Sequence, residues 1–199
     1  MRKLLIVFGF LCTISCSAQE DFKDINTQEK TTLKEFEKLG ELSNLKMAKK
    51  REPGQKMVLC ITFIDKKDKT PVKDQTVLLY QTAEDGNYHP KYASDESTAR
   101  IKAIGITDDK GRLFVNTILP GSYASSGDNR HIHTKVFGAK PEAYDLHFKQ
   151  FTNARMKRFI ESRDQFFLVD LKRTKKKKLI GFVTIEVKNP KKPTNNERN

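Results

Sequence analysis

The 199-residue chain contains no tryptophan, only four histidines and only three cysteines. Cys12 and Cys16 lie in an apolar run near the amino terminus, which leaves Cys60 alone in the run "MVLCITF". A lone cysteine has no disulfide partner within the chain, so a disulfide-stapled scaffold is excluded. We expect Cys60 to pack as a small hydrophobic side chain, and the domain to be held together by its core.

Long hydrophobic runs are also missing, apart from one near the amino terminus. Arg2 and Lys3 precede "LLIVFGFLCTISC", which is too short to span a bilayer comfortably. A basic start, a short apolar core and small residues predict a secretory signal over residues 1–18. Two processing routes stay open. "TISC" resembles a relaxed bacterial lipobox, which would make Cys16 a lipidated first residue, whereas cleavage after Ala18 would leave no lipid.

We therefore expect an exported protein. One form is an outer-membrane, periplasmic or cell-surface lipoprotein, tethered to the membrane through a lipid on Cys16. The other form is a soluble protein that is secreted or periplasmic. Cys12, and Cys16 in the second case, would leave with the leader, so the mature domain would keep Cys60 as its only thiol.

The charge is strongly unbalanced, because 38 lysines and arginines face 25 acidic residues and give a formal net charge of +13. Such an excess would suit nucleic-acid binding. The lysines are scattered along the whole chain, however, apart from the run Lys175–Lys178 and a cluster near the carboxyl terminus. No recognition-helix pattern or aromatic-rich RNA-binding motif accompanies them. We predict a solvated basic surface and no nucleic-acid partner.

Residues 19–55 are polar and charged, which predicts a helical arm or linker ahead of the main domain. Apolar residues recur there at three-residue steps, with one more following, and this spacing places them on one side of a helix. They are Leu33, Phe36, Leu39, Leu42 and Leu45.

Between residues 56 and 188 the pattern changes to short runs rich in apolar and β-branched residues, separated by turn signals. "DDKG" between two of these runs predicts a β-hairpin. A short helical segment is expected at 153–164. This rhythm predicts an all-β, antiparallel two-sheet β-sandwich, and residues 189–199 are expected to be disordered. The predicted strands are 56–65, 75–83, 100–108, 112–119, 130–138, 144–151, 165–174 and 179–187.

The segment "HIH" raises the main question about function. Side chains alternate across a strand, so His131 and His133 share one face while Ile132 points to the other, into the core. Two imidazoles on one strand face form a ready metal site, but an ordinary exposed strand face would carry the same pattern. Tyr123 follows the turn "LPGS" and Tyr88 lies in the loop "DGNYHP", so both phenols could converge with the histidines at one end of the sandwich.

A neutral phenol is a poor metal ligand, because its pKa lies near 10. A trivalent cation would lower that pKa strongly and hold the phenolate. Two phenolates and two imidazoles therefore suit a hard ferric ion.

The stretch "TDDKGRLFVNTILPGSY", followed by "HIH", resembles the core of the intradiol ring-cleavage dioxygenases, the family that contains protocatechuate 3,4-dioxygenase and catechol 1,2-dioxygenase. Members typically show T-D-x-x-G-x-y-x-F-x-T-I-x-P-G-x-Y, followed by R-P-A-H-I-H. Upstream, "KTPVKDQTVLLYQTAEDGNY" is similar to the family's P-V turn, a strand ending near W-Q, and an A-x-G-R-Y loop. The resemblance covers about residues 56 to 188 and implies the β-sandwich core of this family.

The resemblance implies a non-haem Fe(III) cofactor held by Tyr88, Tyr123, His131 and His133. Tyr92 is a rival for the first position. It also implies a small catechol-type aromatic substrate that chelates the iron and displaces Tyr123, whose phenolate could take up a substrate proton. The ring would then open with O₂ between the two hydroxyl carbons, giving a muconate-type diacid.

The chain departs from the family pattern at an arginine thought to stabilise negative charge on the activated ring. The family's arginine stands three residues before the first histidine, whereas Arg130 is directly adjacent to it. On a strand Arg130 would point away from the iron, unless a bulge intervenes. Arg130 is therefore a candidate catalytic residue and equally a candidate edge charge. His147, in "YDLHF", could face the site or the solvent, and we expect solvent or the core.

Two alternatives stay open beside the dioxygenase. One is a transthyretin-like binding sandwich without chemistry, which would have no need of the four-ligand set. The other keeps the iron but only binds catechol compounds, without turnover. The oligomeric state is not predicted.

Overall fold

The computed structural model describes residues 22–123 and 129–191. The predicted leader, with Cys12 and Cys16, and residues 192–199 of the predicted tail lie outside the described residues. Within those two ranges, neither α-helix is long and apolar enough to cross a membrane.

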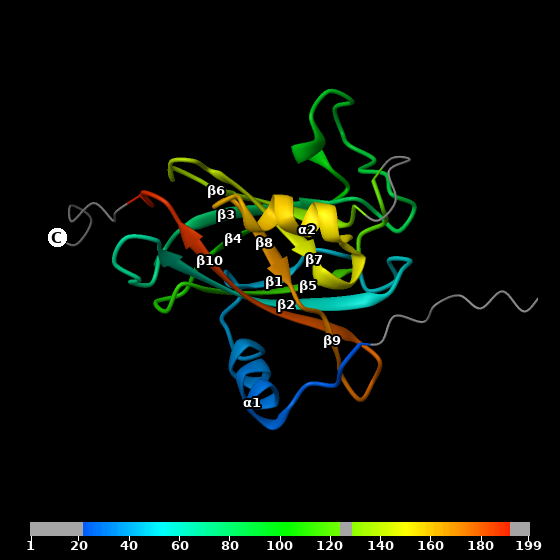
Figure 1. Cartoon of the computed structure of the whole chain (residues 1–199), viewed down its shortest axis with the longest axis horizontal. Helices are drawn as coiled ribbons and strands as arrows, with labels where there is room; N and C mark the ends of the chain where they lie inside the picture. The colour runs from blue at the N-terminus through cyan, green and yellow to red at the C-terminus, as the bar shows by residue number, and fades with distance from the viewer. Residues whose placement is uncertain (1–21, 124–128, 192–199) are drawn as a thin grey trace, which may run out of the picture.

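Two five-stranded sheets pack face to face, which confirms the predicted all-β sandwich (Figure 1). Sheet A has the order β1 (Asn44–Lys46), β5 (Arg112–Ile118), β2 (Lys56–Asp65), β10 (Leu179–Val187), β9 (Lys172–Arg173). Sheet B has the order β4 (Ile101–Ile106), β3 (Thr76–Gln81), β6 (His131–Val136), β7 (Ala143–Phe148), β8 (Phe166–Val169). The described helices are α1 (Thr27–Phe36) and α2 (Ala154–Glu161), with 3₁₀ turns η1 (Glu96–Thr98) and η2 (Lys149–Phe151).

The core lies between the sheets and follows from strand alternation. On β6, His131, His133 and Lys135 are half-buried, whereas Ile132, Thr134 and Val136 point inward and are buried. Ile132 is fully buried, as predicted. On β2 both faces are apolar and both are covered. The odd-numbered residues pack between the sheets, and the even-numbered residues pack under α1.

The sandwich is mixed rather than purely antiparallel, so that part of the prediction holds only in part. Three pairs are parallel: β1 with β5, β2 with β10, and β7 with β8. Parallel neighbours need long connections, since the chain must return to the same end of the sheet before pairing. Here β10 joins β2 only after the chain has completed sheet B. Local strand patterns carry no information on such distant pairings.

The predicted hairpin at "DDKG" was wrong, because β4 belongs to sheet B and β5 to sheet A. The turn itself forms as its residues suggest. Asp108 accepts hydrogen bonds from the backbone N–H groups of Lys110 and Arg112 and from the Arg112 guanidinium. Gly111 has a φ of 71°, and a Cβ there would lie 2.3 Å from the Phe63 carbonyl oxygen. The turn therefore carries the chain across the sandwich.

The predicted amino-terminal helix is present as α1, capped by a reciprocal box in which Asn26 and Glu29 bond to each other's backbone N–H. Phe36 lies against the outer face of sheet A. The helix ends at Phe36, and although Leu39 still packs against the same cluster, the predicted single face fails after it. Leu42 is 67% exposed, and Leu45 lies in β1, where its backbone pairs with β5. Pairing with a sheet edge outweighs the helical period in this short stretch.

Candidate metal centre

The candidate residues gather on the outer face of sheet B, where strand register brings them together. Tyr80, His133 and Asp145 lie opposite one another on β3, β6 and β7. His131 lies opposite His147 in the next outward-facing pair. Directly opposed residues share a face of the sheet, so one end of the sheet presents imidazoles, a phenol and a carboxylate.

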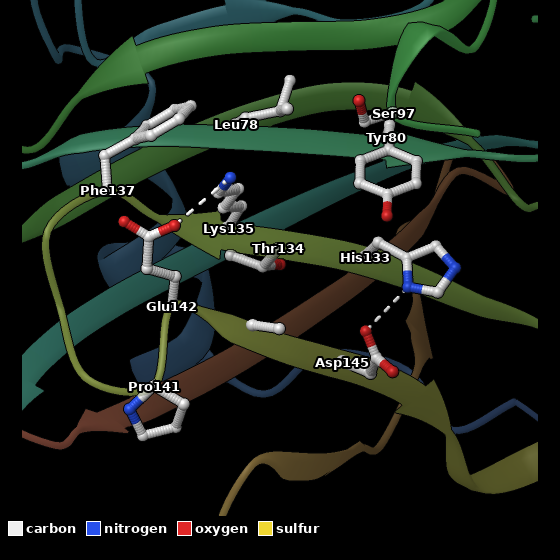
Figure 2. Close-up of a pocket in the computed structure, with 11 residues that line it drawn as sticks. Leu78, Tyr80, Ser97, His133, Thr134, Lys135, Phe137, Pro141, Glu142 and Asp145 are labelled. Carbon is white, nitrogen blue, oxygen red and sulfur yellow. Dashed lines mark hydrogen bonds and ion pairs between the residues drawn. The ribbon is translucent and has the colours of Figure 1, made fainter. Parts of the chain in front are cut away.

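His133 is held from two sides. Its Nδ1–H donates to Asp145 Oδ1 at 2.8 Å, and its ring stacks on Tyr80 with 4.7 Å between centroids (Figure 2). The lone pair of its Nε2 is thereby directed away from the carboxylate. That atom lies 2.8 Å from the Tyr88 hydroxyl oxygen and 3.0 Å from Nε2 of His131.

His131 is oriented in the same sense by the backbone. Its Nδ1–H donates to the Asn129 carbonyl oxygen at 3.0 Å, which leaves Nε2 as the free acceptor. Burial, and then the neighbouring His133, lower the pKa of His131. Two Nε2 lone pairs directed at one point repel each other unless a positive charge lies between them. A cation bound by both Nε2 atoms would remove this repulsion.

Tyr88 reaches this point from the loop that follows β3. Two glycines allow this loop and the loop after β5 to touch: a Cβ on Gly86 would lie 2.2 Å from the Ser122 carbonyl oxygen, and one on Gly121 would lie 2.3 Å from that of Glu84. The backbone N–H of Gly121 also donates to the Ala83 carbonyl oxygen. The buried Tyr88 is thus set beside the residues of the second loop, and burial raises its pKa.

Tyr123 follows Gly121 in the second loop and lies beside Tyr88, with 5.6 Å between the ring centroids. Its side chain is 39% exposed. Its hydroxyl donates to Glu96 Oε1 at 3.3 Å. The structure therefore brings Tyr88, His131 and His133 into direct contact through their donor atoms, and places Tyr123 next to them with its hydroxyl directed at Glu96.

The structure also shows where the side chains of Tyr92 and Arg130 lie. Tyr92 is 55% exposed and carries the Lys91 ammonium over its ring, so Tyr88 and not Tyr92 contacts the histidines. The Arg130 guanidinium lies over the ring of Phe151, 4.4 Å from its centroid. Phe151 belongs to the core, so Arg130 is directed toward the core side of β6, as alternation predicts for a neighbour of His131.

His147 is 8% exposed and stacks on His131 with 5.2 Å between centroids. Burial lowers its pKa to about 4. The expectation that it faces solvent or the core missed this contact with the site, because the pairing of β7 with β6 decides it.

The donor set fits a metal ion. Donors about 2 Å from one ion and at right angles to each other lie about 3 Å apart, which matches the separations of His133 Nε2 from Tyr88 Oη and from His131 Nε2. Among the described residues, no group of three or more His, Cys, Asp or Glu side chains could hold a metal. The centre therefore depends on its phenol oxygens, which favour a hard, highly charged cation.

A groove of about 640 Å³ runs along the same face beside His133 and Asp145 (Figure 2). Leu78 and Phe137 give the groove apolar walls. An ion pair between Lys135 and Glu142, at 3.2 Å, lines the part of the groove away from His133. The centre thus borders an open space large enough for a small organic molecule.

Sequence reasoning missed Asp145 and Tyr80 as well as His147. The one available signal was "YDLHF", in which Asp145 and His147 alternate like the residues of "HIH". Burial of Asp145 opposes its ionisation, but the hydrogen bond from His133 and the nearby imidazoles outweigh this and lower its pKa.

Comparison with known proteins places this geometry in context. A family model described as "Dioxygenase" matches residues 35–197. A search of curated proteins gave no match.

Among solved structures, the dioxygenase domain of a carbohydrate-binding fusion protein from Streptomyces sp. SirexAA-E is 18% identical with a TM-score of 0.52, covering 75% of this chain and 92% of that chain. An intradiol ring-cleavage dioxygenase from Tetranychus urticae is 16% identical with a TM-score of 0.51, covering 77% and 88%. The 3-chlorocatechol 1,2-dioxygenase from Rhodococcus opacus 1CP is 14% identical with a TM-score of 0.55, covering 76% and 66%. At these identities the structural likeness shows the shared fold.

Proposed function

The chain belongs to the intradiol ring-cleavage dioxygenase family, and from this premise we propose that it is a non-haem iron(III)-dependent dioxygenase. It opens a catechol-type ring with O₂ between the two hydroxyl carbons and releases a muconate-type diacid. The observation that carries the proposal is the contact of Tyr88 Oη with Nε2 of His133, and of that atom with Nε2 of His131.

Tyr88, Tyr123, His131 and His133 would hold the iron. Bound iron(III) would supply the Lewis acidity that makes a catecholate reactive toward O₂. The buried Tyr88 and the two hydrogen-bonded histidines are the fixed donors, since each is locked by its surroundings. Tyr123 is the donor that can leave, because its side chain is half-exposed and its hydroxyl already has an acceptor in Glu96.

Substrate binding requires that catechol hydroxyl protons go elsewhere. If Tyr123 leaves the iron as a phenolate, its Oη would take up one of the two catechol protons and become a neutral phenol. Glu96 Oε1 then accepts the hydrogen bond of that phenol, as it does now at 3.3 Å. The protein thus supplies a proton acceptor beside the substrate site.

A second candidate function is iron-dependent binding of catechol compounds without turnover. The position of Arg130 favours it, because its guanidinium stacks on Phe151 in the core. An arginine in that position does not offset negative charge on a ring at the outer face of β6. The two functions share the metal centre and differ in whether the ring opens.

Iron reconstitution of the purified protein tests both functions. Phenolate ligation of iron(III) gives a visible charge-transfer band, so we expect a reddish solution. Tyr88→Phe should remove most of that band, and the matched control Tyr92→Phe should leave it unchanged. With catechol under air, O₂ uptake that matches formation of a muconate-type acid supports the dioxygenase, whereas a shifted band without product supports binding alone. A protein that stays colourless after reconstitution rules out both and leaves the non-enzymatic binding sandwich.

The location of the protein is a separate proposal, which rests on the sequence of residues 1–18. We propose that it acts outside the cytoplasm, as a lipoprotein or as a soluble exported protein. Metabolic labelling with a fatty acid, compared between the natural chain and Cys16→Ser, separates the two forms. Recovery of the uncleaved chain in the cytoplasm would exclude both.

A further inference from the structure

We propose that Asp145 is a positioning residue that sets how tightly the centre binds its metal ion, by holding His133 as the tautomer whose Nε2 lone pair is directed toward Tyr88 and His131. The inference rests on the proposed function for the existence of the metal centre. It adds a residue outside the four-ligand set and assigns its task.

The two histidines have different hydrogen-bond acceptors behind them. Nδ1–H of His131 donates to a neutral backbone carbonyl, that of Asn129. Nδ1–H of His133 donates at 2.8 Å to a carboxylate, that of Asp145. A charged acceptor bonds more strongly to an imidazole N–H and makes the opposite nitrogen a better electron donor. His133 is therefore the stronger imidazole donor of the pair.

The orientation of His133 depends on the same contact. Tyr80 stacks on one face of the ring, with 24° between the planes, which still allows a 180° flip about the Cβ–Cγ bond because the flipped ring lies in the same plane (Figure 2). The bond to Asp145 removes that freedom, because a flipped ring would place a carbon against Oδ1. Strand register maintains the bond, since Asp145 lies directly opposite His133 on β7. The imidazole is thus preorganised before any ion binds.

The charge of Asp145 also suits such a centre. Iron(III) held by two phenolates and two neutral imidazoles carries one net positive charge, and the Asp145 carboxylate supplies one negative charge beside it. The side chain of Asp145 is 22% exposed, so the compensation acts where water screens weakly.

The experiment compares metal binding by metal-free protein and three variants. Asp145→Ala removes the acceptor, and Asp145→Asn keeps an acceptor of the same shape without the charge. The matched control is Glu142→Gln, which removes a carboxylate in the same groove that pairs with Lys135. Co(II) serves as the probe, titrated against a competing chelator and followed by its visible bands. We expect the affinity to fall about 10–100-fold for Asp145→Ala, less for Asp145→Asn, and not at all for the control.

A second readout separates positioning from general stability. In metal-free protein, ¹⁵N NMR of the histidine side chains should show His133 with its proton on Nδ1, and Asp145→Ala should convert it to a mixture of tautomers. Equal Co(II) affinity of the natural protein and Asp145→Ala, or an unchanged tautomer in that variant, would overturn the inference. If Asp145→Ala does not fold, Asp145→Asn decides the affinity on its own.

The two proposals fail in different ways. Co(II) binding that depends on Asp145, in an iron-loaded protein that does not open catechol, contradicts the dioxygenase and supports the inference. Catechol cleavage that continues with Asp145→Ala at unchanged metal affinity contradicts the inference and supports the dioxygenase.

Discussion

The outer faces of the two sheets have opposite chemistry although they belong to one sandwich. On sheet A, Val58, Cys60 and Phe114 form an apolar surface that α1 covers with Phe36. On sheet B, the corresponding surface carries two histidines whose Nε2 atoms lie 3.0 Å apart, together with the phenols, carboxylate and third imidazole described above. One face is covered by the chain itself, and the other borders an open groove.

The difference between the two faces follows from the pattern of buried and exposed residues along the strands. β2 is apolar at both odd and even positions, so each of its faces needs a cover. β6 alternates between buried and half-buried residues, so its outer face stays open. Changes under α1 on sheet A should therefore alter stability without touching the candidate metal centre, whereas changes at the outer face of sheet B should alter that centre.

The largest stability effect is expected at the cover of sheet A. Phe36→Ala removes a buried ring from the α1 contact and should lower the free energy of unfolding by about 3 kcal/mol. Urea unfolding measures this, and the iron band of the folded variant should be unchanged. The control is Leu42→Ala, whose exposed side chain should contribute less than about 0.5 kcal/mol. Equal losses in the two variants would remove the proposed difference between these positions.

On sheet B, His147 should make the metal-free protein sensitive to acid. Burial lowers its pKa from the ordinary 6.5 to about 4, so between these values the unfolded chain binds a proton that the folded protein does not. Stability should thus fall as the pH drops from 6.5 toward 4, by at most about 3 kcal/mol. His147→Gln should flatten this part of the curve. Urea unfolding at successive pH values measures it, and parallel curves for both proteins would contradict the prediction.

A smaller effect is expected where α1 begins. Asn26→Ala breaks the capping box with Glu29 and should lower stability by about 1 kcal/mol. Burial raises the pKa of the Cys60 thiol beneath this helix to about 12, so the native protein should react slowly with a thiol reagent. The variant should react faster, because α1 opens more often. Reaction kinetics with an aromatic disulfide measure this; unchanged kinetics would mean that α1 does not control access to Cys60.

The smallest effect is expected at the exposed ion pair of Lys135 and Glu142 on the sheet B face. Both side chains are more than a third exposed, so Lys135→Ala should change stability by less than about 0.5 kcal/mol. Thermal unfolding with and without added salt measures it. A loss above about 1 kcal/mol would show that this open face is also stabilised by its own polar contacts.

Features that depend on residues close together in the sequence were predicted correctly, whereas features that depend on contacts between distant segments were not. The strand at 56–65 was predicted with the bounds of β2, because a continuous apolar run needs no partner to be recognised. The shared face of His131 and His133 follows from alternation alone. By contrast, the parallel pairing of β2 with β10, the crossing of "DDKG" between sheets and the position of Asp145 opposite His133 depend on contacts between distant segments.

The close approach of the loop after β3, which carries Tyr88, and the loop after β5, which carries Tyr123, limits how this protein can be redesigned. Gly86 and Gly121 each sit where the backbone of the other loop leaves no room for a side chain. A graft that replaces one loop with a longer or bulkier one will therefore displace the other, and with it the tyrosine that the other loop carries. The loops of Tyr88 and Tyr123 must be exchanged as a pair, so the transferable module of this fold is discontinuous in sequence.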